Sequence, residues 1–524
     1  MIGVEIINRY VTAGNREQIS VFPMCLDEMI APDNEVRAID AIVDRMDILS
    51  MGFTYSKTKD TGRKPYNPVD LFKLYAYCYL NGIRSSRKIE RECYRNIEVF
   101  WLMRELKPDF KTIADFRRNN KKQFKKAFTK FSMICDELGL IGKEMVAIDG
   151  SKFRASNSRL AYNSFYKVEK KIEYYRKAAE HYLSLLENCD RQESDGAKAK
   201  PSKDEIEAKV ERVNRRLNEL EVMKKEVQEN GAIYTTDPDS RMMKTNGGLD
   251  ICHNVQIAVD DKSHLVVAVD VTSEPVDKEQ LHRMGLQAKE ELGVETLTAA
   301  ADKGYYSASE FAKCKEDGII PIVPKADHSH MAATKEYGKS QFQYDEENDA
   351  YICPQGHLLK AYKPRKKNPK IPGLKRYRNY EACSKCEVKD QCSSSKTGRT
   401  IQDRPNQREA DEVDRRTEEN PDMYKIRKQL VEHPFGTIKR SFGYSYFLTR
   451  GTDNVRTESL LHFLAYNMKR VINIRGTREI VALLGANTSL RPILGYLEWF
   501  LVAALKIGTG KCGWKKIVST QPGQ

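Results

Sequence analysis

The stretch that decides the fold of this chain reads Met145-Val146-Ala147-Ile148-Asp149-Gly150-Ser151-Lys152-Phe153. Four apolar residues lead to one carboxylate, and a glycine follows it directly. An apolar run of this length that ends at a glycine predicts a short buried strand with Asp149 at its tip. An unpaired charge in that position costs free energy, and a metal cation would compensate it. The sequence therefore predicts further carboxylates that share a metal ion with Asp149.

A second apolar run repeats this pattern further along the chain. Residues 297–301 lead to Asp302, which a lysine and a glycine follow. Other segments predict two hairpin strands, two helices and a last strand, at 253–260, 264–270, about 277–292, 307–317 and 319–324. Strands and helices in this order predict a mixed α/β sheet. Asp260 and Asp270, which end the two hairpin strands, are expected to be turn formers.

A third carboxylate lies on a helix that we expect at about 421–440. Glu432 and Lys439 are seven residues apart, so they share a face if the helix continues past Pro434. Phosphodiester cleavage needs an activated water and a stabilised leaving oxygen, and two divalent ions held by carboxylates supply both. Mg²⁺ prefers oxygen ligands and keeps several waters, so a few carboxylates suffice. The alternative is that the aspartates are strand-end turn formers and that Glu432 is an exposed helix charge.

Length and charge restrict the class of protein. The 524 residues predict two to four structural units. The net charge of +14 and the pI of about 9.0 favour a polyanionic partner, and a merely soluble basic protein is the alternative. Eight of the 12 cysteines are scattered singly, and the N-terminus does not resemble a signal peptide, which predicts a reducing, cytoplasmic location. The longest apolar run, 499–505, is too short to span a bilayer.

The N-terminal part of the chain reads as a series of short helices. Asn67 and Pro68 predict a helix start with proline at the first helical position, and an Asn-Gly pair predicts its end. Short helices on tight turns are typical of helix-turn-helix DNA readers, and an ordinary helical bundle is the alternative. The helical region extends over 36–140, and both interpretations remain open for it on the pattern alone. A weakly structured segment over 1–35, with a strand at Val4–Ile7, would precede it.

Residues 103–130 are basic and aromatic at the same time. Ten lysines and arginines alternate with Phe110, Phe116, Phe124 and Phe128. Helical spacing can place the rings inside and the cations on a face that meets phosphates. A solvated charged face is the alternative.

Residues 163–230 are long, charged and helical. Apolar residues at steps of three and four between Ile206 and Val227 predict a coiled-coil-like seam. A matching stripe precedes it, and a polar loop at 190–203 separates the two. We expect an antiparallel helical hairpin inserted into the α/β fold. A dimer contact and a DNA contact both remain open for it.

The four other cysteines lie close together in the sequence. They are Cys353, Cys383, Cys386 and Cys392. Four thiolates suit tetrahedral Zn²⁺, so this group predicts a structural zinc site, although His357 could replace one ligand. Reduced, metal-free thiols are the alternative. Lysines and arginines between 363 and 378 form either a DNA-contacting stripe or a disordered basic loop, because three prolines interrupt them.

Five short motifs follow one another along the chain. They read Asp149-Gly150-Ser151-Lys152-Phe153, Thr236-Asp237-Pro238-Asp239-Ser240-Arg241-Met242-Met243-Lys244, Asn254-Val255-Gln256, Ala301-Asp302-Lys303-Gly304-Tyr305 and Glu432-His433-Pro434-Phe435-Gly436. Together they resemble the DDE transposases of bacterial insertion sequences, and most of all the group named insertion sequence eleven-eighty-two. The resemblance covers nearly the whole chain. Tyr424, Arg427, Glu432 and Lys439 resemble the Tyr-Arg-Glu-Lys signature of a related group. The gap between Arg427 and Glu432 is one residue longer than in that signature. Lys428 is therefore an alternative to Arg427.

This resemblance implies a ribonuclease-H-like mixed sheet as the catalytic core. It implies two Mg²⁺ or Mn²⁺ ions in each active site, held by Asp149, Asp302 and Glu432. It also implies contacts with DNA phosphates, made by Tyr424, Arg427 and Lys439.

The implied activity is metal-dependent DNA cleavage at the ends of a mobile element and strand transfer into target DNA, which is cut-and-paste transposition. The alternatives are a nuclease without strand transfer and a DNA-binding protein that no longer cleaves. The implied partner is double-stranded DNA, as terminal inverted repeats and as target, with no membrane. Because two DNA ends must be joined, we expect a homodimer. Its expected location is the bacterial cytoplasm, at the nucleoid. The expected units are 1–35, the DNA-binding domain 36–140, a catalytic core of 141–162, 231–324 and 406–475, the hairpin 163–230, the Cys-rich basic insert 325–405 and the tail 476–524.

Overall fold

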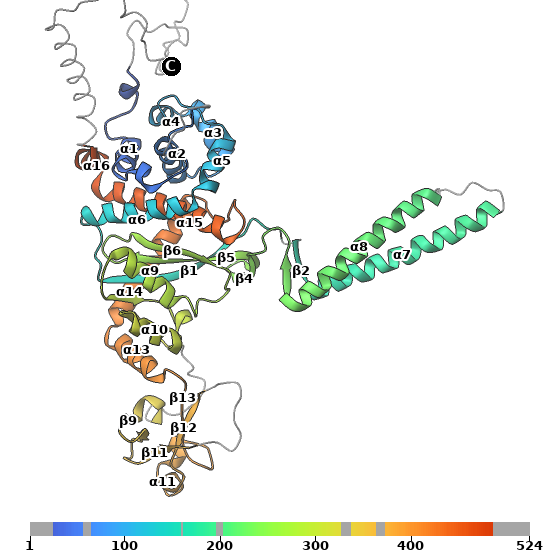
Figure 1. The fold of residues 1–524 in the computed structure, drawn as a ribbon. Coiled ribbons are helices and arrows are strands. Elements are labelled where there is room, and N and C mark those ends of the chain that lie inside the picture. The colour runs from blue at the N-terminus through green and yellow to red at the C-terminus, as the bar shows by residue number, and fades with distance from the viewer. Residues whose placement is uncertain are drawn as a thin grey trace, which may run out of the picture.

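The structure is a computed structural model that describes residues 25–55, 64–158, 161–194, 203–325, 337–362 and 373–485. Three parts follow one another along the long direction of Figure 1: a group of N-terminal helices, a six-stranded sheet with its helices, and a five-stranded sheet. A pair of long helices projects sideways from the middle part. The strand expected at Val4–Ile7 and the apolar run 499–505 lie outside the described residues. Within the described part of the chain, no helix is long and apolar enough to cross a membrane.

The central sheet contains both parallel and antiparallel strands. Strand β1 (Met145–Arg154) lies in its middle, with β5 (Gly248–Asp260) antiparallel on one side and β7 (Leu297–Ala300) parallel on the other. Strand β6 (Val266–Thr272) is antiparallel to β5, and β8 (Ile319–Ile322) is parallel to β7. The order β6-β5-β1-β7-β8 confirms the mixed α/β sheet that the sequence predicts.

Two features of this sheet differ from the sequence prediction. Strand β1 does not end at Asp149, because β5 is long enough to pair with it as far as Arg154. Asp149 therefore lies in the middle of a strand, opposite Ile257, and the prediction that it stands at a strand tip was wrong. The sequence prediction also lacked β4 (Arg241–Thr245), which pairs with the first residues of β5.

The helices of the sheet occur where the sequence predicts them, with one addition. Helix α9 (Leu281–Leu292) connects β6 to β7, and α10 (Ala308–Glu316) connects β7 to β8. The chain later returns to the sheet as α13 (Gln407–Glu419), which was not expected, and α14 (Pro421–Gly436), which was. Helix α14 continues through Pro434 and passes into a π-helical turn at Thr437–Ser441.

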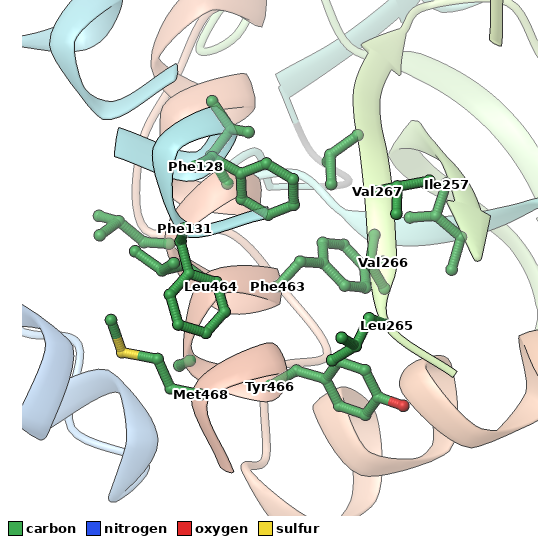
Figure 2. Close-up of a cluster of buried hydrophobic side chains, with 14 of the residues drawn as sticks. Phe128, Phe131, Ile257, Leu265, Val266, Val267, Phe463, Leu464, Tyr466 and Met468 are labelled. Atoms are coloured by element: carbon green, nitrogen blue, oxygen red, sulfur yellow. The ribbon is translucent and has the colours of Figure 1, made fainter. Parts of the chain in front are cut away.

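Helix α15 (Thr452–Arg475) lies at the centre of the main hydrophobic core. Most of its residues between Val455 and Ile472 are buried, as expected for a core helix. Figure 2 shows Phe463 of this helix turned toward Val266 of β6, with Phe128 and Phe131 of α6 (Lys121–Glu137) in the same cluster. The short helix α16 (Thr477–Leu484) follows.

The N-terminal helices belong to the same core. The elements are η1 (Leu26–Met29), α1 (Glu35–Arg45), η2 (Ile48–Met51), α2 (Pro68–Leu80), α3 (Ser86–Arg95), α4 (Ile97–Leu102), α5 (Phe110–Asn119) and α6 (Lys121–Glu137). Asn67 caps α2 by accepting a hydrogen bond from the Val69 amide, which confirms the predicted helix start. Phe116, Phe124 and Phe128 are buried as predicted, whereas Phe110 is 41% exposed and lies under the guanidinium of Arg87. One continuous hydrophobic cluster joins these helices to the sheet.

The expected helical hairpin is present. Helix α7 (Phe165–Ser194) and α8 (Lys203–Asn230) pack along each other around a small apolar cluster that includes Val168 and Leu220. Helix α7 extends past residue 190, where the sequence analysis placed the start of the loop. At the base of the hairpin, β2 (Tyr162–Ser164) pairs with β3 (Ala232–Tyr234). Figure 1 shows the hairpin as an arm that leaves the body of the protein.

The Cys-rich insert forms a sheet of its own. Its strands are β9 (Gln343–Asp345), β10 (Ala350–Ile352), β11 (Leu358–Ala361), β12 (Lys375–Arg378) and β13 (Thr400–Asp403), all antiparallel to their neighbours. Two short helices, α11 (Tyr380–Ser384) and α12 (Lys389–Cys392), lie between β12 and β13. Buried tyrosines, including Tyr351 and Tyr377, fill a separate small core. Most of the basic stripe between 363 and 378 lies outside the described residues.

Candidate active site

Asp149 lies within β1, and Asp302 follows the neighbouring parallel strand β7 by two residues. Ala147 of β1 is in register with Ala300 of β7, and each aspartate follows its alanine by two residues. The Asp302 carboxylate accepts a hydrogen bond of 2.8 Å from the Gly304 amide, which fixes the turn η4 (Lys303–Tyr305). The topology of the sheet thus brings together the two aspartates that the sequence singled out.

The charge of Asp149 is perturbed by its surroundings. Burial raises the pKa of Asp149 to about 6; the Arg427 guanidinium opposes this rise, and the charges of Asp302 and Asp277 add to it. Repulsion between the two carboxylates favours a bound cation, because a cation stabilises both ionised forms at once.

Arg427 supplies a positive charge beside Asp149 in this structure. Its side chain is 8% exposed, and its Nη2 lies 3.0 Å from Asp149 Oδ1. The Arg427 Nε is also buried, and it has no hydrogen-bond partner among the residues that the structure describes. Helix α14 therefore places a guanidinium with one unused donor next to the aspartate pair. Tyr424 lies half-buried three residues earlier on the same helix.

Glu432 does not join the aspartates in this structure. Its side chain is 66% exposed, and its ion-pair partner is Lys428 at 3.8 Å. Glu432 lies five positions after Arg427, which on an α-helix corresponds to a rotation of about 140° from the face that meets Asp149. Among the described residues, no group of three or more His, Cys, Asp or Glu side chains is arranged to hold a metal ion.

Lys439 reaches the site from the π-helical turn. Its ammonium donates hydrogen bonds to Ser151 Oγ (2.6 Å) and to the Lys152 carbonyl (2.9 Å), and it lies over the Phe153 ring. Burial lowers the pKa of Lys439, and the charges of Cys252 and Asp149 oppose this effect. Helical segments with π-type hydrogen bonding are often found at functional sites. Lys439 thus lies beside the strand of Asp149, whereas Glu432 is exposed.

A polar residue that the sequence analysis missed lies behind this site. Asp277, in the loop before α9, accepts hydrogen bonds from Lys152, Asn254 and Gln256. The Asn254-Val255-Gln256 motif contained the signal, because two amides at alternate positions of a buried strand need polar partners. Its partner could not be identified from spacing, since Asp277 lies on a loop.

The four cysteines of the insert line one small cavity of about 30 Å³ in the five-stranded sheet. The His357 amide donates a hydrogen bond to Cys353 Sγ at 3.4 Å, and burial raises the pKa of Cys392. At Gly398, a Cβ atom would lie 2.3 Å from Cys383 Cβ, so the chain approaches this cavity closely. The structure therefore gathers the predicted thiols without placing three of them as metal ligands.

Comparison with known families identifies two parts of the chain. Residues 24–119 match a family described as a transposase domain (DUF772), and residues 352–472 match a family described as a transposase DDE domain. The second match includes Arg427, Glu432, Lys439 and all four cysteines of the insert, whereas Asp149 and Asp302 precede it. A search of curated proteins and of solved structures found no match.

The two matches define the class of protein, an enzyme of DNA transposition with a DDE domain. They support the more specific assignment as well, and the chain is a DDE transposase of the bacterial insertion-sequence type. Neither match selects one insertion-sequence group.

Proposed function

We propose that this transposase cleaves DNA at the ends of its element and joins the freed 3′ ends to target DNA. The observation that carries the proposal is the pair of Asp149 in β1 and Asp302 just after the adjacent parallel strand β7, next to a buried guanidinium from the helix of the DDE domain. Paired carboxylates and fixed cations at one sheet edge suit a reaction in which negative charge builds up on phosphate oxygens.

We also propose a ribonuclease-H-like catalytic core. Three antiparallel strands, β6, β5 and β1, continue into the parallel pair β7 and β8, and helices connect the parallel strands. This arrangement supports the proposal, because it places β1 and β7 side by side, with Asp149 in β1 and Asp302 two residues after β7.

The residues at the sheet edge fit a divalent cation. Asp149 and Asp302 offer hard oxygen ligands that repel each other, and their backbone positions are fixed by the sheet and by the Gly304 amide. Asp149, Asp302 and Glu432 would hold Mg²⁺ or Mn²⁺, two ions in each active site. When bound, such ions activate water and stabilise the leaving oxygen.

Cationic residues of the chain would bind and orient the DNA. Arg427 has a buried Nε donor with no partner in the described part of the chain, and Lys439 lies one helical segment later beside β1. Both side chains can donate to phosphate oxygens, and the guanidinium can do so with two parallel hydrogen bonds. Tyr424, half-buried three residues before Arg427, would contact the same backbone.

The remaining parts of the chain would serve recognition and assembly. The helices of 36–140 would read the terminal repeats, consistent with the net charge of +14 and the DUF772 match. The cavity of Cys353, Cys383, Cys386 and Cys392 would hold a structural Zn²⁺, because four thiols that line one small cavity are a fitting donor set. A homodimer would bring two element ends together.

Cleavage and joining of a labelled element end in Mg²⁺ test the proposal. The variants are Asp302→Asn and Glu432→Gln, and the matched control is Glu419→Gln. Glu419 pairs with Arg415 four residues away and is 57% exposed, so it resembles Glu432 in its surroundings. We expect the wild type and the control to cut and join, and the two test variants to bind the end without cutting. If Glu432→Gln retains the wild-type rate, Glu432 is a surface charge; if all proteins bind without cutting, the chain is a DNA-binding protein.

A further inference from the structure

Two amide side chains of β5 take no part in the proposed chemistry, although they lie directly behind it. Asn254 and Gln256 are fully buried and, being two residues apart, point to the same face of the sheet. In the register with β1, Asn254 faces Lys152, and Gln256 faces Gly150. Asp149 lies one position from Gly150, so its side chain points to the opposite face, toward Arg427 of α14.

The side chains on this rear face converge on Asp277. Its Oδ1 accepts from Asn254 Nδ2 (2.6 Å), Gln256 Nε2 (2.7 Å) and Lys152 Nζ (3.1 Å), and its Oδ2 accepts from the same ammonium at 3.2 Å. All these partners donate, so the position requires a group that only accepts, which among acidic and amide side chains is an ionised carboxylate. Asp277 is 24% exposed, and Lys152 neutralises its charge.

This group of side chains contacts the backbone next to both catalytic aspartates. A Cβ atom on Gly150 would lie 2.2 Å from Gln256 Nε2 and 2.7 Å from Asp277 Oδ1, so the residue after Asp149 rests directly on the network. At the other end, the Tyr305 hydroxyl donates to Gln256 Oε1 at 2.5 Å. Tyr305 is fully buried and ends the turn that begins at Asp302. Gln256 therefore connects the strand of one aspartate to the turn of the other.

We propose that Asp277, Asn254 and Gln256 form a positioning network that fixes the separation of Asp149 and Asp302 for a divalent cation. The network acts through the backbone at Gly150 and the turn at Tyr305, and Asp277 is a positioning residue that does not itself bind the ion. This inference rests on the proposed function. Outer partners of metal ligands commonly change metal affinity by about 10–100-fold when they are removed.

The test measures Mn²⁺ binding directly, by electron paramagnetic resonance of the free ion during titration, in the full chain without DNA. The variant is Asp277→Ala, and the matched control is Asp270→Ala. Asp270 lies on the neighbouring strand β6, opposite Gln256 in the register, and its half-buried carboxylate pairs with Arg283 and Arg456. We expect Asp277→Ala to weaken Mn²⁺ binding by about tenfold or more, while Asp270→Ala stays within about twofold of the wild type. Binding of an element end in EDTA and the melting temperature are measured for each protein, and we expect similar values for the two variants.

A second variant separates positioning from a local fold defect. Gln256→Ala removes the link to Tyr305, and the double variant with Asp277→Ala should bind Mn²⁺ more tightly than the product of the two single effects predicts, because both residues act in one network. If Asp277→Ala binds Mn²⁺ as the control does, or if the two effects multiply independently, the network does not position the aspartates and only this inference fails. If the wild type binds no Mn²⁺ at all, the proposed function fails and this inference fails with it.

Discussion

Removal of the Glu458 carboxylate should destabilise the whole protein, because this buried group joins the loop before α3 to α15 in the main core. Glu458 of α15 is fully buried, and it pairs with Arg84, which is 6% exposed and precedes α3, at 3.3 Å. The carboxylate also accepts from the Leu448 amide (3.1 Å) and from the amide and hydroxyl of Thr449 (2.9 and 2.7 Å). The neighbouring His462 cannot supply the positive charge, since burial lowers its pKa well below the ordinary value and Arg84 lowers it further.

The magnitude follows from what Glu458→Ala leaves behind. Arg84 would remain buried without its counter-charge, and three donors of residues 448 and 449 would lose their acceptor. Breaking a buried ion pair on one side costs about 3–5 kcal/mol, which for a large domain corresponds to a fall in the melting temperature of roughly 10 °C. An exposed helical pair is worth about 0–1 kcal/mol, so Glu479→Ala, which breaks the Arg475–Glu479 pair at 45% exposure, is the control.

Thermal and urea unfolding followed by circular dichroism measure the difference. We expect Glu458→Ala to unfold at a clearly lower temperature and urea concentration than the control. The double variant Arg84→Met with Glu458→Leu should recover most of the lost stability, since it leaves no unpaired buried charge. A loss below about 1 kcal/mol for Glu458→Ala would refute the reasoning, because it would mean that the N-terminal helices do not depend on this pair.

Three further predictions concern the site and the insert. Without divalent ions, Asp149→Asn should raise the melting temperature above about pH 6, because the pKa of Asp149 is raised to about 6 and its ionised form destabilises the fold. The gain in melting temperature should vanish toward about pH 4, where the wild-type carboxyl is protonated. A constant gain between about pH 4 and pH 7 would contradict the raised pKa. Gly150→Ala should cost about 1–3 kcal/mol in urea unfolding and abolish cleavage, because its Cβ would lie 2.2 Å from Gln256, and an active, stable variant would contradict the close packing there. The purified protein should contain about one zinc per chain, and Cys383→Ser should lose it, as metal analysis by mass spectrometry would show; equal zinc in both proteins would exclude the cysteine site.

The central sheet and its aspartate pair could be predicted from the sequence because both depend on local patterns. Apolar runs that end near Asp149 and Asp302 predict buried strands, and the adjacent parallel strands β1 and β7 bring those ends to one edge. The end of β1 could not be predicted in this way, since Ser151 and Lys152 read as loop residues. They form strand because β5 offers backbone partners as far as Arg154, which is a tertiary effect.

The five-stranded sheet of the insert lay beyond local patterns for a different reason. Its strands are three or four residues long and carry many charged residues, so neither alternation nor an apolar run marks them. The Asp277 network could not be predicted from local patterns either, because its members are distant in sequence and its acceptor lies on a loop. Only the two amides of β5 indicated it, because buried polar side chains need hydrogen-bond partners.

Helix α14 shows where spacing stops being informative. Seven residues bring two side chains to nearly the same direction on a regular α-helix, so Glu432 and Lys439 were expected to share a face. The π-helical turn at Thr437–Ser441 closes its hydrogen bonds over five residues instead of four, and this changes the direction of every side chain that follows. Lys439 reaches Ser151 from this turn. Arg427 and Glu432 lie on the regular helix before the turn, five positions apart, so Arg427 faces Asp149 while Glu432 faces outward beside Lys428. The seven-residue spacing therefore does not place Glu432 and Lys439 together, because the helix changes its hydrogen-bond pattern between them.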